Sequence, residues 1–173
     1  MEDEIILRLF PVLRRAWSFR GEQAVVGITG HNAKRVLFGA INMCTGHRTL
    51  MQQTRMSATG FQDFLRRLHR RYPTKPIWML LDRGSAHISP QSQALAKELN
   101  IELVWLPKQC PELNAMDHLF KEVKAHICAN HQYATIEDHI HSAEQYLLHL
   151  TNKEALKKAG ILSKNFWLKS FFK

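Results

Sequence analysis

The chain has 173 residues, of which 45% are hydrophobic and 23% are charged, and its formal net charge is +9. This composition is typical of one globular domain, and it excludes a disordered tail, a collagen-like fibre and a disulfide-stapled mini-protein. The apolar runs are far shorter than the ~20 residues of a membrane helix, and the acidic start is unlike a signal peptide. The excess of basic residues favours a nucleic acid as partner, because contacts with phosphates release counterions. We therefore expect a cytoplasmic protein without a membrane partner.

Antiparallel β-structure is predicted for the first part of the chain. A short apolar strand over residues 24–28 precedes a longer one over residues 35–44. Thr45-Gly46 then supplies a turn into a returning strand over residues 47–55.

Helix and strand patterns alternate in the remainder of the chain. Ser57 is a typical N-cap for a helix that has apolar residues at helical spacing and arginines on its other face. The apolar run of residues 77–81 suits a strand that is buried on both faces. The further elements are a helix over residues 90–100, a strand over 101–106, a loop over 107–114, and helices over 115–131 and 135–150. This order predicts an α/β domain over residues 1–150, with a mixed central sheet flanked by helices, and a basic helical extension over residues 151–173 packed on it.

The cysteines and histidines do not define a metal framework. The three cysteines are widely spaced, so the sequence implies no disulfide framework. Cys128-x-x-His131 offers half of a zinc site, but no second pair stands at finger-like spacing. We interpret these side chains as part of the surface of basic helices.

Two aspartates lie where an α/β fold concentrates its chemistry. Asp82 directly follows the apolar run, at the carboxyl end of the predicted strand, and Asp117 falls in the first turn of a later helix. The 34 residues between them hold one helix and one strand, which returns the second carboxylate to the same end of the sheet. Taken singly, Asp82 suits a turn and Asp117 suits a partner of the helix dipole, so a structural role stays open for each.

Grouped carboxylates predict a divalent metal. Two carboxylates ~4 Å apart repel by about 4 kcal/mol at an effective dielectric of 20, and a cation between them offsets that repulsion. Mg²⁺ uses few protein carboxylates and keeps positions for water and phosphate oxygens. Two such ions ~3.5–4 Å apart activate a nucleophile and stabilise a leaving oxygen. A basic surface around such a centre predicts phosphoryl transfer on a nucleic acid.

Three sequence motifs follow one another from Asp3 to about Leu150. They are Asp3-Glu4 followed by Pro11, Trp17 and Gly21; Leu81-Asp82-x-x-x-x-His87; and Trp105-Leu106-Pro107 followed by Cys110-Pro111-Glu112-Leu113-Asn114, Asp117 and Lys124. In this order and with the 34-residue gap, the motifs resemble the DDE catalytic domain in the IS630 group of the IS630/Tc1/mariner transposases.

The resemblance implies an RNase H-like fold, and strand cleavage and strand transfer on DNA that depend on two Mg²⁺ or Mn²⁺ ions. Asp3, Asp82 and Asp117 would be the catalytic residues and the metal ligands. Glu4, next to Asp3 on a strand, would face away from it. His87 and Asn114 match positions near the site, where they orient a ligand or contact DNA. The basic side chains assigned to DNA contact are Arg83, Lys108, Lys121 and Lys124.

The implied partners are transposon ends and target DNA. A homodimer is left open, no small-molecule substrate is expected, and in a prokaryote the protein would associate with the nucleoid.

The sequence departs from the family pattern at several positions. Asp117 replaces the glutamate that is usual in the IS630 group, although mariner relatives use aspartate. Arg83 stands where asparagine is usual, and Ala115 stands where proline is frequent. Only two residues precede Asp3 and no helix-turn-helix region precedes the domain, so we expect a truncated first strand and a fragment that cannot transpose alone.

Two alternatives follow from these departures and from the fold. One is a DNA-binding remnant without productive metal sites. The other is an ordinary RNase H-like nuclease, against which the 34-residue spacing argues.

Overall fold

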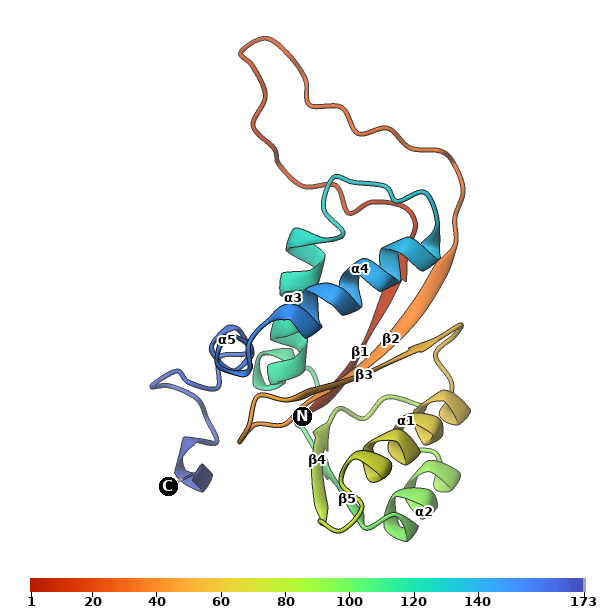
Figure 1. Cartoon of the computed structure of the whole chain (residues 1–173), viewed down its shortest axis with the longest axis vertical. Coiled ribbons are helices and arrows are strands. Elements are labelled where there is room, and N and C mark those ends of the chain that lie inside the picture. Colours follow the sequence, from red (N-terminus) through yellow and green to blue (C-terminus); the bar gives the residue numbers. More distant parts are fainter. Residues whose placement is uncertain (173) are drawn as a thin grey trace.

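The computed structural model describes residues 1–172, with side chains described through residue 170. The described part contains five strands and five α-helices (Figure 1). The strands are β1 (Glu2–Arg8), β2 (Lys34–Ile41), β3 (Arg48–Gln53), β4 (Ile77–Leu81) and β5 (Ile101–Trp105). The helices are α1 (Ala58–Arg71), α2 (Pro90–Glu98), α3 (Ala115–His126), α4 (Ile136–His149) and α5 (Asn152–Lys158), with 3-10 turns η1 (Pro111–Leu113) and η2 (Lys169–Phe172). None of these helices is long and apolar enough to cross a membrane.

The strands form one antiparallel ladder and one parallel ladder. β2 lies between β1 and β3, with Asp3 opposite Gly39. β4 and β5 run parallel, with Leu81 opposite Trp105. The predicted mixture of antiparallel and parallel strands is confirmed, although they are hydrogen-bonded as two ladders that meet where β1 contacts β4 (Figure 1).

Alternate residues of β2 supply two separate hydrophobic cores. Leu37 and Ile41 pack in the core that contains α3, α4 and α5, whereas Val36 and Phe38 pack in the core that contains α1 and β4. Figure 1 shows α3 and α4 on one side of the antiparallel ladder and α1 and α2 on the other. Successive side chains of a strand point to opposite faces, so an uninterrupted apolar strand such as β2 suits burial from both sides.

Helix α1 has the predicted cap and the predicted apolar face. The Ser57 hydroxyl accepts a hydrogen bond from the Gly60 backbone N–H at 3.1 Å, which satisfies one of the free donors of the first turn. The buried face of the helix carries Phe61, Phe64, Leu65 and Leu68, and the arginines point to solvent. Burial of each such side chain contributes about 1.5–3 kcal/mol to folding.

The strand predicted over residues 24–28 is wrong. Residues 10–33, which we call the arm, form a long excursion without regular structure that projects from the body (Figure 1). The short apolar run pairs with no strand of the described chain, and Val25 is 87% exposed. The base of the arm is held to the loop between α3 and α4, where Arg14 N donates to Asn130 Oδ1 and Thr29 N donates to Gln132 Oε1.

Helix α3 ends at His126 instead of continuing to residue 131. The backbone groups beyond it bond to the arm: Val12 N donates to Cys128 O at 2.9 Å, and Asn130 N donates to Val12 O at 3.0 Å. Asn130 has a φ of 54°, which no α-helix allows. The helical pattern of the sequence therefore extends into a segment whose backbone is taken up by a long-range contact.

Most of strand β1 lies after Asp3 in the chain, and one residue of the strand precedes it. It spans seven residues, all paired with β2, and Asp3 is the second of them. At the other end of the chain, Ala155, Ala159 and Ile161 are buried in the same core as α3 and α4. The extension after residue 150 thus packs on the body through α5.

Candidate active site

Three different elements carry the aspartates that the sequence analysis singled out. Asp3 lies near the start of β1, Asp82 directly follows β4, and Asp117 lies in the first turn of α3. The last three residues of β4 are buried, so the chain leaves the core at Asp82. The parallel neighbour β5 then leads through η1 into α3, which returns the chain to the same edge.

Helix α3 approaches the sheet closely beside Asp3. Gly39 lies opposite Asp3 in the ladder and has no side chain. A Cβ at this position would lie 2.6 Å from Met116 Cε and 2.9 Å from Phe120 Cζ, both on α3. The glycine therefore permits the spacing that brings the start of α3 toward β1.

Asn114 fixes the first turn of α3 from the inside of the protein. Its Oδ1 accepts a hydrogen bond from Met116 N at 3.0 Å, and its Nδ2 donates to the Glu2 carbonyl at 2.8 Å. The side chain thus caps the helix and joins it to β1 at once. Through these two bonds the backbone that carries Asp117 is held against the strand that carries Asp3.

The three aspartates line one open cleft of about 550 Å³. Its other walls include Glu4, Gly84 and the loop of residues 106–111. Within the described residues, the three carboxylates do not approach to within 4.8 Å of one another as a group. The space between them is therefore large enough for ions or water.

The carboxylates of the cleft influence one another. Burial raises the pKa of Asp3 to about 7, and the charges of Glu4, Asp117 and Asp82 add to this rise, against a backbone hydrogen bond from Glu4. Asp117 is partly compensated, because Lys121 Nζ lies 2.8 Å from its Oδ2. A carboxyl that resists ionisation beside like charges is one that a cation would help to ionise.

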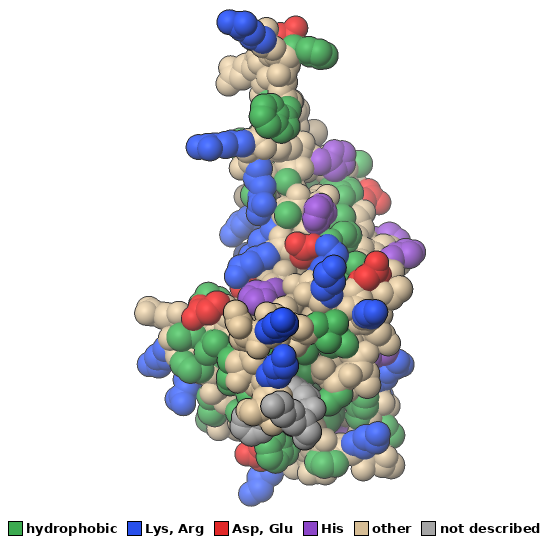
Figure 2. Space-filling model, turned by 90° about the vertical axis from the view of Figure 1, so that its left-hand side faces the viewer, with side chains coloured by type: hydrophobic (Ala, Val, Ile, Leu, Met, Phe, Trp, Pro, Cys, Tyr) green, Lys and Arg blue, Asp and Glu red, His purple; other side chains and the backbone are tan. Residues whose placement is uncertain are grey.

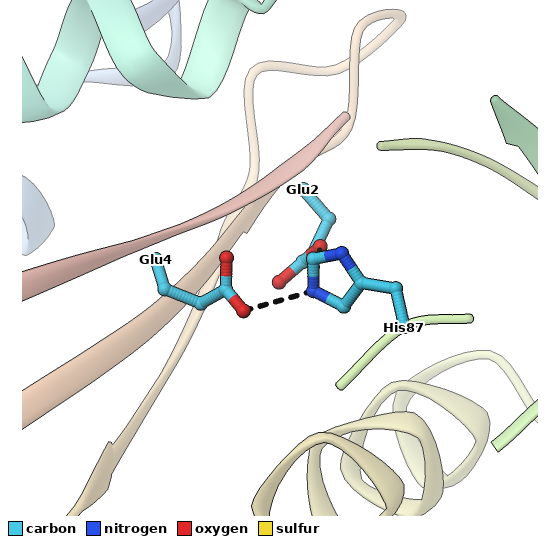
Figure 3. A group of neighbouring side chains, drawn as sticks. All are labelled: Glu2, Glu4 and His87. Carbon is cyan, nitrogen blue, oxygen red and sulfur yellow. Dashed lines mark hydrogen bonds and ion pairs between the residues drawn. The ribbon is translucent and has the colours of Figure 1, made fainter. Parts of the chain in front are cut away.

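His87 bonds to Asp82 and also lies against two glutamates of β1, Glu2 and Glu4. Figure 3 shows the His87 ring beside these two glutamates. Its Nδ1 donates to Asp82 Oδ1 at 3.0 Å and its Nε2 donates to Glu4 Oε1 at 2.8 Å, while Glu2 Oε2 lies 3.6 Å from Nε2. Burial alone would lower the pKa of His87, but the bonds to Asp82 and Glu4 and the charge of Glu2 raise it to about 11. The hydrogen bond from His87 lowers the pKa of Asp82 and so favours its carboxylate form.

A family model described as a DDE superfamily endonuclease matches residues 1–140. The chain belongs to this superfamily. A search of curated proteins finds no match.

Solved transposase structures share the fold of this DDE domain. The mariner Mos1 paired end complex with Mg matches with a TM-score of 0.72 at 18% identity, covering 96% of this chain and 52% of that one. The Mos1 transposase paired-end complex with left transposon end matches with a TM-score of 0.71 at 17% identity, covering 95% and 52%. The catalytic domain of Mos1 mariner transposase matches with a TM-score of 0.60 at 14% identity, covering 75% and 69%. The RNase H-like fold expected from the motifs is thus confirmed, and the chain spans about half the length of the first of these proteins.

The donor set of the aspartate cleft fits hard divalent cations. Three carboxylates from three elements line an open space, and carboxylate oxygens with free positions for water are what Mg²⁺ and Mn²⁺ take in proteins. Burial first, and then the charges of the neighbouring carboxylates, raise the pKa of Asp3, and a bound cation would oppose this rise.

The basic residues assigned to DNA contact occupy different positions around the cleft. Arg83 and Lys108 line it and are exposed, and the Arg83 guanidinium lies 5.9 Å from the Trp105 ring centroid. Lys121 pairs with Asp117, and Lys124 is exposed further along α3. Figure 2 shows further Lys and Arg side chains along the whole length of one face, up to the tip of the arm.

Sequence reasoning did not assign a role to Glu2 and placed Glu4 away from the chemistry. The alternation of β1 does turn both away from Asp3, toward the core of α1. There, however, they meet His87, whose ring lies 4.5 Å from that of Phe61. His87 and Asn114 are 1% and 4% exposed, so their geometry supports positioning of neighbouring groups. The sequence feature that could have indicated this contact is the pair of acidic residues two apart on β1, together with the histidine of the Asp82-x-x-x-x-His87 motif.

Proposed function

We propose that this chain is the catalytic domain of a DNA transposase of the IS630 group, which cleaves DNA strands and joins them by phosphoryl transfer with two Mg²⁺ or Mn²⁺ ions. The observation that carries the proposal is the convergence of Asp3, Asp82 and Asp117 on one cleft from three separate elements. Membership of the DDE superfamily and the fold shared with Mos1 transposase support it.

The ions would be held by the three aspartates and would activate water or a 3′-hydroxyl and stabilise the leaving oxygen. The remaining side chains act on the position and charge of these ligands. His87 keeps the Asp82 carboxylate ionised and aimed at the cleft through its Nδ1–H. Asn114 holds the turn that presents Asp117. Arg83 and Lys108, exposed on the walls of the cleft, supply positive charge for the phosphates of the DNA.

A nicking assay on supercoiled plasmid with Mn²⁺ or Mg²⁺ tests the proposal. Asp82→Asn and Asp117→Asn should each reduce nicking about 100-fold or more, the usual effect of removing one group that stabilises transition-state charge. Asp63→Asn is the matched control, because this carboxylate lies on α1 and pairs with Arg66 at the surface. Equal nicking by all three variants would contradict the proposal.

A parallel measurement of DNA binding distinguishes the transposase domain from the alternative of a DNA-binding remnant. The remnant would bind DNA with or without Asp82→Asn and nick it in neither case. An RNA–DNA hybrid as substrate separates the ordinary RNase H-like nuclease, which would cleave the hybrid in preference to duplex DNA.

The homodimer stays part of the proposal, and the arm is the surface that a second copy would cover. The arm exposes Trp17, Phe19 and Val25 almost completely, which is unusual for large apolar side chains. Light scattering should give twice the chain mass, and Trp17→Ser with Phe19→Ser should return it to one chain mass. Trp78→Ser is the control, because Trp78 is also exposed but lies on β4. A monomer at all concentrations, with and without DNA, would refute the dimer.

A further inference from the structure

We infer that Glu2, Glu4 and His87 form a second metal site, next to the aspartate cleft and with different ligands, for one divalent transition-metal cation of the Zn²⁺ class. The site lies on the opposite face of β1 from Asp3, between that strand and the segment that follows β4 (Figure 3). In the described residues, this is the group of acidic and histidine side chains whose ligand atoms all lie within 4.8 Å of one another.

Glu2 is the observation that calls for a ligand. Its side chain is fully buried, and neither carboxylate oxygen has a hydrogen-bond partner among the described residues. Figure 3 shows this carboxylate directed at the His87 ring, beside the carboxylate of Glu4. An ionised carboxylate in this position is strongly unfavourable, and a protonated one would still hold an O–H without an acceptor. A bound cation removes both difficulties, because it neutralises the Glu2 carboxylate and coordinates its oxygen directly.

The distances suit such an ion. His87 Nε2 lies 2.8 Å from Glu4 Oε1 and 3.6 Å from Glu2 Oε2. Ligands about 2.1 Å from a tetrahedral zinc ion are separated by roughly 3.4 Å, so small side-chain shifts bring all three into place. The ion would take the place of the proton that His87 Nε2 shares with Glu4, and this proton is released to solvent on binding. Two carboxylates and a neutral imidazole then balance the double charge of the ion.

The surroundings of His87 are those of a metal-binding histidine. Its second ring nitrogen, Nδ1, donates to Asp82 Oδ1, and metal-bound histidines commonly give their other N–H to a carboxylate in this way. The Phe61 ring packs on the imidazole and fixes its plane. Glu2 and His87 are buried, and the Glu4 side chain is 5% exposed at the wall of the aspartate cleft, so the ion would be largely enclosed, with its fourth position left to water. Through His87 it would also hold Asp82, one of the aspartates of the cleft.

Zinc binding to the full chain in excess Mg²⁺ tests this inference. Mg²⁺ favours oxygen ligands and competes weakly for imidazole, so it masks the aspartate cleft and leaves the buried site to Zn²⁺. The chain is stripped with a chelator and titrated with Zn²⁺ against a zinc-sensitive dye, and native mass spectrometry counts the ions. We expect one tightly bound Zn²⁺ per chain, and about ten-fold or greater weakening in Glu2→Gln.

The variants separate this site from the cleft. Glu102→Gln, the same change on the exposed side of β5, should keep the zinc, and so should Asp117→Asn. Glu4→Gln replaces Glu2→Gln if the latter does not melt cooperatively. No stoichiometric zinc in the folded wild type would overturn the inference, and so would zinc that survives Glu2→Gln but is lost in Asp117→Asn. Zinc bound in a chain that never nicks DNA would support this site and count against the proposed function alone.

Discussion

Arg48 joins the C-terminal extension to the sheet, so its substitution should weaken the contact between them. It lies on β3 and is only 7% exposed. Its guanidinium donates to four backbone carbonyls and one side-chain oxygen, from the turn before β3 and from the junction of α4 and α5. These acceptors are Gly46 O, Leu147 O, Leu148 O, Leu150 O and Asn152 Oδ1.

We predict that Arg48→Met lowers the free energy of unfolding by about 3–5 kcal/mol, because several carbonyl oxygens would lose their donor, at about 1–3 kcal/mol for each one that stays buried. A hydrogen bond to a charged group contributes about 1.5–3 kcal/mol, but five bonds of one side chain do not add. Methionine keeps the buried stem, so the loss reports the guanidinium. For a chain of this size the melting temperature should fall by roughly 6–20 °C.

Thermal melts by circular dichroism measure this effect, with Arg35→Met as the control. Arg35, on β2, pairs with Glu137, which is 62% exposed. Such a surface pair contributes about 1 kcal/mol or less, so the control should melt within a few degrees of wild type. Equal melting temperatures for the two variants would refute the view that Arg48 joins the α4–α5 junction to the sheet.

Three further predictions concern the same fold. Gly46→Ala should destabilise the chain by more than about 1 kcal/mol, because Gly46 has a φ of 74° and a Cβ would lie 2.2 Å from the backbone oxygen of the first residue of α5. The control is Gly27→Ala, whose Cβ meets nothing within 4 Å and which should leave the melting temperature unchanged. Ser57→Ala should cost about 1 kcal/mol in denaturant unfolding through loss of the α1 cap, and an unchanged midpoint would contradict that role. Burial raises the pKa of the Cys128 thiol to about 11, so at pH 8 the thiol stays protonated and should react with an alkylating reagent only after unfolding. The exposed Cys44 should react in the native chain, and mass spectrometry of the labelled peptides distinguishes the two cysteines.

The elements that the sequence predicted correctly are those with local causes. The α1 helix begins at the Ser57 cap and has one apolar face, and both features are written in a single stretch of chain. The five-residue apolar run of β4 gave a strand because it is too short for a buried helix and is bounded by polar residues. Asp82 follows from β4 directly, and Asp117 follows from the start of α3.

The errors have long-range causes. Residues 24–28 carry a strand pattern, but none of the five strands in residues 1–172 pairs with them. The helical pattern up to residue 131 is interrupted at His126 because Val12, more than a hundred residues earlier, takes the backbone bonds of Cys128 and Asn130. A pattern in one segment cannot report which distant backbone will compete for its hydrogen bonds.

The sequence by itself determined the α/β class, the order of most elements after residue 57, and the three aspartates as candidates for one centre. The packing of the extension on the domain was also expected, but only the tertiary structure decided that these carboxylates share a cleft and which residues of the extension enter the main core. It alone also brought Glu2 and Glu4 to His87, 83 residues beyond Glu4 in the chain. The reason is physical: caps and periodicity act within a few residues, whereas desolvation and charge coupling depend on which distant side chains the packing of two cores places around one strand.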